Sequence, residues 1–411
     1  MADMLRESPY PMVSIADATA MIMAHAQPLG SEEIDALTAL GRVLATDIVA
    51  PEDIPDVPKA AMDGYALRAG DGLAPRRVVG ELTAGGATTV ALGPGEATRI
   101  MTGAPMPCGA DAMIPVEMTE ERDGMLFIQR ELQPGDYVHT VGQDVARGQI
   151  ALTAGTTLGA AEIGILATLG ITRILAYRRP RVAVLATGDE VVEPSETRPG
   201  GAVRDSNRYA LMAAVREAGG EPISLGIARD DAAVQRQAIL RGLEQADVLI
   251  TSGGVSMGTR DLIKPLLAEL GTVHFGRIAF KPGKPTTFAT VGGKLVFGLP
   301  GFPVSSLVSF EVFVRPALRA LQGDATPFRP RVAVTLAEPI RPSPDRPEYQ
   351  RIIVTYREGR LVAVSTGSQS SSRILSLRGA NGLLLVPAGE TVYPAGSTLP
   401  ALLTGPLLSE G

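Results

Sequence analysis

Short apolar runs alternate with amphipathic stretches through the middle of the chain. The runs RVAVLAT (181–187) and DVLITSGG (247–254) have the length and the β-branched content of buried strands. A stretch with helical spacing, NRYALMAAVREAGG (207–220), lies between them. Alternation of this kind is typical of a sheet whose parallel strands are connected by helices. The pattern therefore predicts a doubly wound, mostly parallel α/β domain.

The N-terminal half follows a different pattern. Two stretches near the start, SIADATAMIMAHA (14–26) and SEEIDALTALGRVLA (31–45), have helical spacing, and AAEIGILATLG (160–170) returns to it. Between them lie short β-like runs separated by Gly and Pro, such as TTVALGPGEATRIM (88–101). We therefore expect a helical N-terminal domain into which a β domain is inserted.

Strand and turn signals return near the end of the chain, for example in RVAVTLAEPI (331–340). They predict a C-terminal β domain, so the expected fold class is multidomain α/β plus β. The expected domains are a helical N-terminal domain at 1–50 and 144–177, an inserted β domain at 51–143, the α/β domain at 178–326 and a C-terminal β domain at 327–411.

Composition and charge narrow the class of protein. The chain has 411 residues, of which 45% are hydrophobic and 20% charged. A formal net charge of −6 without a basic patch argues against nucleic-acid binding. The one cysteine, Cys108, excludes an internal disulfide framework and a multi-cysteine zinc site. Because the sequence also shows no signal peptide and no apolar stretch of about 20 residues, we expect a cytoplasmic protein that does not bind a membrane.

The candidate site follows from the predicted sheet, because ligands of open parallel sheets collect outside the carboxyl ends of the strands. One loop there, TSGGVSMG (251–258), offers backbone N–H groups that suit an oxyanion, although a tight turn alone also explains its glycines. The loops that follow predicted strands are TGDE (187–190), ARDD (228–231), TSGGVSMG with the nearby Asp261, KPGKP (281–285) and GLPGFP (298–303).

Three acids, Glu190, Asp230 and Asp261, lie on three separate loops of this set. Mg²⁺ is typically held by one or two carboxylates together with substrate phosphate, so the three acids together favour a magnesium site. Capping of a following helix explains Asp230 or Asp261 equally well when each is taken alone. The residues thus indicate a Mg²⁺-assisted enzyme that acts on a phosphate-bearing ligand.

The cations near these loops also indicate an anionic ligand. Lys281 and Lys284 flank a Pro-Gly turn, and Arg277 precedes them, which suits a multiply charged anion. The histidines His25, His139 and His274 are widely separated and show no metal-ligand spacing, so they favour surface or structural roles.

These loops, together with AAMDGYA (60–66) and MTGAPMPCGAD (101–111), resemble the motifs of molybdopterin molybdenumtransferases, the MoeA family that includes the E domain of gephyrin. The resemblance runs from about residue 10 to residue 405, with the motifs in the same order. It implies an elongated homodimer of four-domain subunits. It also implies the reaction, a Mg²⁺-dependent insertion of molybdate into adenylylated molybdopterin with release of AMP.

The resemblance assigns roles to individual positions. Its implied metal ligands are Glu190, Asp230 and Asp261. Its implied catalytic residues are Asp63, Thr102, Asp144, Glu190, Asp230, Asp261, Lys281 and Lys284. The implied substrate-binding residues are Thr187, Gly188, Ser252, Gly253, Gly254, Ser256, Arg277, Pro300, Gly301, Pro303, Arg351, Ser368 and Ser370.

The chain departs from the family pattern at two positions. Phe302 stands in GLPGFP where the family commonly has asparagine, and Arg277 stands where some members have lysine. Both bear on the geometry of the ligand more than on the class of reaction. Asp63 and Thr102 are far in sequence from the α/β loops, so the family pattern suggests that a neighbouring subunit delivers them.

Three other functions remain open. A molybdopterin adenylyltransferase has an α/β domain of the same general shape, but it does not need the N-terminal 177 residues. A tungstate-inserting paralogue handles an oxyanion of nearly the same size and charge. A non-catalytic scaffold would not need the acids and lysines. A further expected partner is the adenylyltransferase of the same pathway.

Overall fold

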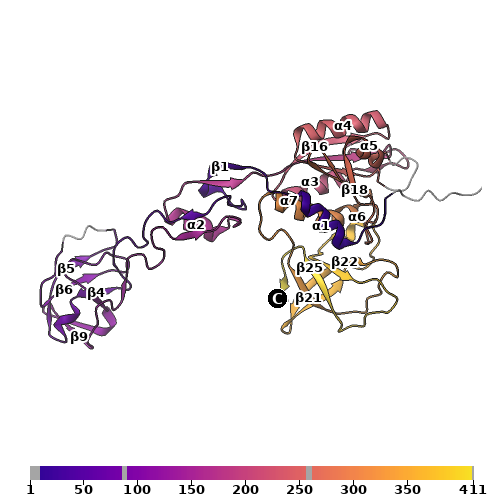
Figure 1. Ribbon diagram of the computed structural model, residues 1–411. Helices are drawn as coiled ribbons and strands as arrows, with labels where there is room; N and C mark the ends of the chain where they lie inside the picture. The colour runs from indigo at the N-terminus through magenta and orange to yellow at the C-terminus, as the bar shows by residue number, and fades with distance from the viewer. Residues whose placement is uncertain (1–9, 86–89, 256–261, 410–411) are drawn as a thin grey trace, which may run out of the picture.

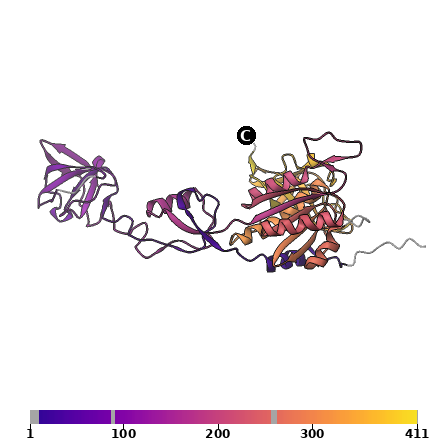
Figure 2. The same cartoon turned by 90° about the horizontal axis from the view of Figure 1, so that it is seen from above.

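The computed structural model describes residues 10–85, 90–255 and 262–409 of the chain and shows an elongated molecule (Figure 1). A small β domain occupies one end, and the α/β domain with the C-terminal β domain occupies the other (Figure 2). A central unit of short strands and one helix lies between the two ends. Prediction and structure therefore agree on a multidomain α/β plus β fold.

The α/β domain is built on a six-stranded sheet in the order β16-β13-β17-β20-β19-β18. The first four strands pair in parallel and the last two pair antiparallel, so the sheet is mostly parallel as predicted. Their bounds are β16 Glu221–Ala228, β13 Arg181–Thr187, β17 Val248–Ser252, β20 Lys294–Leu299, β19 Thr287–Val291 and β18 Thr272–Phe275.

Helices cover both faces of this sheet. Val182 and Val184 of β13 belong to one hydrophobic cluster, whereas Ala183 and Leu185 belong to another. Burial of both sets explains why the strand is a continuous apolar run. The first face carries α3 Asn207–Glu217, α6 Pro303–Ser309 and α7 Arg315–Leu321, with a π-helical turn Phe310–Val314 between the last two, and the second carries α4 Ala232–Gln245 and α5 Ile263–Leu270.

The first predicted helix, α1 Ile15–His25, is present and begins after Ser14, whose hydroxyl accepts a hydrogen bond from the N–H of Asp17. Its residues Ala18 and Ile22 are buried in the first cluster of the α/β domain. The N-terminal helix therefore packs against the α/β domain rather than against the central unit.

The prediction of a second helix over 31–45 is wrong. Ser31–Asp35 forms strand β1, which pairs antiparallel with β12 Arg173–Tyr177, and a short 3₁₀ turn Ala36–Thr38 follows. The pairing places Ile34 opposite Ile174, within the hydrophobic cluster of the central unit. This tertiary contact outweighs the local helical pattern.

The central unit also contains helix α2 Ala160–Thr168 and the strand pair β2 Ile48–Val49 and β11 Ile150–Leu152. Its core joins residues before and after the inserted segment, including Leu44, Leu158 and Leu166. The two chain segments that flank the β domain are thus packed against each other.

The small β domain is a six-stranded sheet in the order β7-β4-β6-β5-β9-β8. A two-stranded ribbon, β3 Lys59–Ala60 with β10 Val138–His139, connects it toward the central unit. The strands of the sheet are β7 Ala112–Pro115, β4 Gly64–Leu67, β6 Glu96–Ile100, β5 Arg76–Leu82, β9 Met125–Ile128 and β8 Thr119–Arg122.

The C-terminal β domain is barrel-like, because β22 pairs with both β24 and β23 and so closes the order β23-β21-β25-β24-β22. The short β26 pairs with the outer end of β22. The bounds are β21 Arg331–Leu336, β22 Glu348–Arg357, β23 Arg360–Ser365, β24 Gly382–Val386, β25 Thr398–Leu403 and β26 Leu408–Ser409.

A joint connects the central unit to the α/β domain. The ring of Tyr177 lies against Gly323, where an added Cβ would come within 2.2 Å of the ring. Arg319 donates to the hydroxyl of Thr157 at 3.1 Å across the same joint. Among the described helices, none is long and apolar enough to cross a membrane.

Candidate functional site

A cavity of about 1270 Å³ lies at the carboxyl ends of β13, β17 and β20, which is where the sequence places the candidate site. Residues from all five predicted loops line it. The C-terminal β domain closes one side with Arg346 and with residues Gln369 to Ser372. The site is therefore shared by two domains of one chain.

Glycines let the loop after β17 pass close to the loop after β13. Gly253 has φ 94°, and a Cβ added to it would lie 2.9 Å from the carbonyl oxygen of Thr187. Its N–H donates to the carbonyl of Leu299 at 3.0 Å. This N–H therefore connects the strand ends, and other groups of the loop must serve any bound anion.

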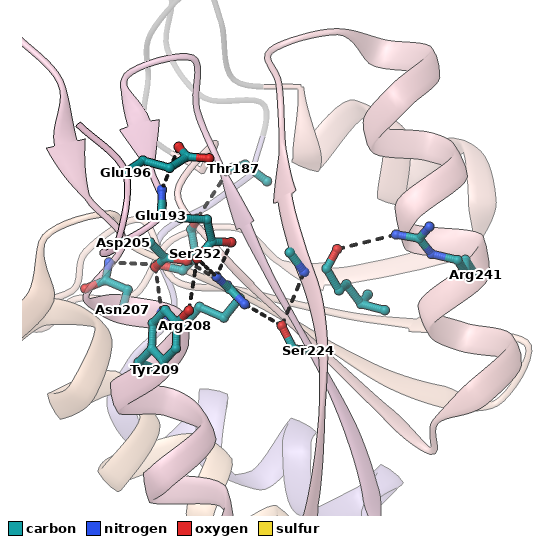
Figure 3. Close-up of polar contacts among 12 residues, drawn as sticks. Thr187, Glu193, Glu196, Asp205, Asn207, Arg208, Tyr209, Ser224, Arg241 and Ser252 are labelled. Carbon is teal, nitrogen blue, oxygen red and sulfur yellow. Dashed lines mark hydrogen bonds and ion pairs between the residues drawn. The ribbon is translucent and has the colours of Figure 1, made fainter. Parts of the chain in front are cut away.

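Asn207, at the start of α3, is a lining residue that the sequence motifs do not indicate. Its side-chain N–H₂ donates to the Ser252 hydroxyl and to the Gly301 carbonyl, each at 2.8 Å. Figure 3 shows the contact with Ser252. One amide thus fixes the loop after β17 to the loop after β20.

Arg208, the next residue, anchors the segment that carries Glu190. Arg208 is 5% exposed. Its guanidinium donates to both carboxylate oxygens of Glu193 at 2.6 Å and to one carboxylate oxygen of Asp205 at 2.7 Å (Figure 3). Burial lowers the pKa of Arg208, but hydrogen bonds and charges from the two acids outweigh it, so the pKa lies above its ordinary value. The residue stays a cation that holds the short strands β14 Val191–Val192 and β15 Val203–Arg204 against α3.

Two predicted lysines and one arginine that the motifs did not indicate face the cavity. Lys281 pairs with Glu348 at 3.3 Å, and Glu348 is only 2% exposed. Lys284 forms no ion pair with another described residue. Arg346 contributes a third cation from the C-terminal β domain. The cavity can therefore offer positive charge to an anion from one side.

The predicted acids Glu190 and Asp230 line the same cavity. Capping of α4 is carried out by Asp231, whose carboxylate accepts from the N–H of Val234, so helix capping does not account for Asp230. Asp261 and Ser256 lie outside the described residues. Within the described ranges, no three His, Cys, Asp or Glu side chains are grouped closely enough to hold a metal ion. Two carboxylates of the predicted magnesium set thus line the same cavity, and the third is not described.

The predicted residues of the N-terminal half lie at a second cavity, of about 680 Å³, beside the ribbon of β3 and β10. Thr102 and Asp144 line it together with Lys59 and His139. Asp63 is exposed next to it and accepts two hydrogen bonds from Thr102. No residue lines both cavities in the described parts of the chain, which places the two predicted groups apart within one subunit (Figure 1).

The remaining predicted ligands differ in position. Thr187, Gly188, Ser252, Gly253, Gly254, Pro300, Gly301, Pro303 and Ser370 line the larger cavity, whereas Arg277, Arg351 and Ser368 do not. Arg351 is 0% exposed and donates to the backbone carbonyls of Ser368 and Ser370 and to the hydroxyl of Ser376. Arg351 therefore does not line the cavity, and instead it holds the backbone of the serine segment, residues 368–372.

Three family models match this chain in sequence order. They describe the MoeA N-terminal region (domain I and II) at residues 13–170, a probable molybdopterin binding domain at 183–320 and the MoeA C-terminal region (domain IV) at 333–404. The chain belongs to the MoeA family. This family membership confirms the predicted resemblance, and with it the expected enzyme class.

Individual relatives agree with the family models. The chain is 36% identical to molybdopterin molybdenumtransferase of Nostoc, covering 94% of this chain and 93% of that one, and 34% identical to that of Bacillus subtilis, covering 97% and 95%. Gephyrin of Dictyostelium discoideum is 36% identical over 98% of this chain, which spans 64% of gephyrin's length. A crystal structure of the MoeA protein of Pyrococcus horikoshii superposes with a TM-score of 0.82 at 28% identity, covering 96% of this chain and all of that one.

Proposed function

We propose that this chain inserts molybdate into adenylylated molybdopterin and releases AMP. The observation that carries the proposal is the larger cavity, where carboxylates and cations from separate loops meet at the carboxyl ends of parallel strands. Its volume exceeds that of ordinary small-molecule pockets, which suits a substrate that joins a pterin to a nucleotide. The named molybdopterin molybdenumtransferases among the relatives support the same reaction.

The cations supply the contacts that an oxyanion needs. Lys281, Lys284 and Arg346 line one region of the cavity, and the serine segment held by Arg351 lies beside them. Charge-assisted hydrogen bonds from such groups are shorter and stronger than neutral ones. We assign molybdate, as a substrate, to these residues.

The carboxylates fit a magnesium ion by their chemistry, because Mg²⁺ prefers oxygen ligands and uses few protein groups when a phosphate is present. Glu190 and Asp230 would hold it, together with Asp261 outside the described residues. A bound Mg²⁺ neutralises phosphate charge and polarises a phosphoryl oxygen. Asn207 holds together the ends of two of the strands that surround the substrate.

We further propose that the working unit is a homodimer. Thr102 and Asp144 line the smaller cavity, and Asp63 is hydrogen-bonded to Thr102. This cavity lies between the small β domain and Thr168 of the central unit, and none of its described lining residues lines the larger cavity that contains Lys281 and Lys284. A composite site is possible when the far end of one subunit reaches the larger cavity of its neighbour. A two-fold dimer repeats such a contact twice.

The deciding experiment measures AMP release from adenylylated molybdopterin with molybdate and Mg²⁺, in parallel with incubation of molybdopterin and ATP. We expect molybdate-dependent AMP release in the first reaction and no adenylylated product in the second. The opposite result would identify an adenylyltransferase. Metal analysis of the product made with molybdate and tungstate together determines which oxyanion is inserted.

The same assay tests Asp261. Asp261→Asn retains the size of the side chain and can still cap a helix, but it is a poor magnesium ligand. We expect a folded protein that loses about 10²–10⁴ in rate, which corresponds to about 3–5 kcal/mol of lost metal assistance. Near-normal AMP release at limiting Mg²⁺, with an unchanged thermal melt, would leave Asp261 as a cap.

A further inference from the structure

Phe302 is the one aromatic side chain among the described residues that line the larger cavity, and 58% of its surface is exposed. We propose that Phe302 is a specificity-determining residue whose ring stacks on a planar heterocycle of the bound substrate. The inference rests on the proposed function only in taking the ligand to contain such a ring.

The backbone around Phe302 is fixed at several points. The Gly301 carbonyl accepts the amide of Asn207 at 2.8 Å, and the Phe302 carbonyl accepts the N–H of Ser306 at 2.9 Å. Pro303 begins α6 and restricts the preceding residue to extended backbone, which agrees with φ −73° and ψ 131° at Phe302. The ring is therefore carried on a rigid loop at the edge of the cavity.

The exposed ring of Phe302 is suited to contact with a ligand. A phenyl face left in water costs free energy that a ligand recovers by covering it, because apolar area leaves water on contact. Because the backbone of this loop is already fixed, only the side-chain torsions of Phe302 become ordered when a ligand binds. Phe302 carries no hydrogen-bonding group, so its contact with a ligand is a flat apolar one.

The aromatic side chain on the cavity lining favours a planar ring as its partner, because aromatic rings stack on one another with an offset. Gly253 and Gly301 lie close together on the lining of the same cavity, and a Cβ added to Gly301 would come 3.6 Å from the Cα of Gly253. Adenine and pterin are both planar nitrogen heterocycles, and stacking on an aromatic side chain tolerates either. The ligands used in the test distinguish the two.

The experiment measures binding by calorimetry to three probes, namely AMP, molybdopterin and molybdate, for the wild type and for Phe302→Ala, Phe302→Asn and Phe302→Tyr. Loss of one stacking contact weakens binding by about 5- to 100-fold. We expect this loss for AMP or for molybdopterin in the Ala and Asn variants. We expect Phe302→Tyr to remain within about threefold of the wild type, since it keeps the ring face. Molybdate binding stays unchanged in every variant.

The outcomes separate the two proposals. A loss confined to AMP places adenine on Phe302, and a loss confined to molybdopterin places the pterin there. Unchanged binding of both in Phe302→Ala, with normal AMP release by the wild type, overturns the stacking inference alone. If the Phe302 variants bind more weakly but the wild type releases no AMP, the proposed reaction alone is overturned. Altered dimerisation without altered binding would make Phe302 a subunit contact and overturn the inference.

Discussion

Asp63 accepts two hydrogen bonds from Thr102, one from the backbone N–H and one from the side-chain hydroxyl, each at 2.7 Å. The backbone bond first, and then the hydroxyl bond, hold the pKa of the Asp63 carboxyl below its ordinary value. The loop that carries Thr102 and the loop before β4 are thereby connected through a carboxylate that stays ionised.

Thr102→Val removes the hydroxyl and keeps the shape and the backbone N–H. We expect the Asp63 pKa to rise toward its ordinary value of about 3.9, because one stabilising bond to the charged form is lost. Carboxyl-carbon NMR titration measures this. The lowered pKa of Glu96, caused chiefly by the N–H of Gly93, serves as an internal control that should not move.

The same pair gives the sign of a pH effect on stability. A carboxyl whose folded-state pKa is lowered contributes stability above its ordinary unfolded value, and this stability is lost as the pH falls through the lowered folded value. Acid unfolding should therefore begin at a higher pH in Thr102→Val than in the wild type. Identical acid transitions would contradict the coupling.

Mixed dimers test the composite site. We expect Asp63→Ala and Lys284→Ala subunits to be inactive separately and to recover about one quarter of wild-type AMP release after mixing. Random exchange makes about half of the dimers mixed, and each mixed dimer has one intact site. Mixing Asp63→Ala with Asp144→Ala is the control, because both changes lie at the same end of the subunit and every site then stays damaged.

Replacement of Lys281 and replacement of Lys284 remove the same charge, but we expect them to lower the stability of the protein by different amounts. Lys281→Met removes the ion pair of the 2% exposed Glu348 and leaves it the amide of Gln350 at 3.2 Å and the nearby charge of Arg351, which should cost about 1–3 kcal/mol in chemical unfolding. Lys284→Met breaks no described ion pair and should cost less than about 0.5 kcal/mol. Adding Glu348→Gln to Lys281→Met should recover most of the loss. Equal losses in the two single variants would remove the structural role of the pair.

Arg351 should control the order of the serine segment. Burial lowers the pKa of Arg351 to about 10, so its charge is kept in the fold at the expense of desolvation. Arg351→Lys lacks the fork that reaches the carbonyls of Ser368 and Ser370. We expect faster amide hydrogen exchange over 368–372 and weaker molybdate binding. Exchange in β24 is the control, and unchanged exchange in both segments would refute the prediction.

The α/β domain could be predicted because its strands are buried on both faces. RVAVLAT and DVLITSGG each have an apolar centre, and each contains a strand of the sheet. The segment 31–45 could not be predicted in the same way, since its partner strand Arg173–Tyr177 is distant in sequence. Helical spacing is a local signal, and pairing with a remote strand is not.

The candidate site shows the same division. Loops that directly follow parallel strands had to meet at one edge, so the positions of Glu190 and Asp230 followed from the sequence. Lys284 reaches the cavity from the segment between β18 and β19, which pair antiparallel. Asn207 and Arg346 reach the cavity from a helix start and from another domain, and neither belongs to a recognised motif. Their approach depends on how the helix and the C-terminal β domain dock, which spacing along the chain does not encode.

The contact between Tyr177 and Gly323 lies at the joint between the α/β domain and the arm that carries the small β domain. The small β domain lies at the end of a long arm, so a slight rotation at the joint becomes a large displacement of Asp63 and Thr102 (Figure 2). Gly323 has φ 72° and no space for a methyl group beside the ring. Gly323, which lines neither cavity, therefore fixes the orientation of the arm that carries Asp63 and Thr102, and its replacement would shift this arm without changing any residue of the candidate site.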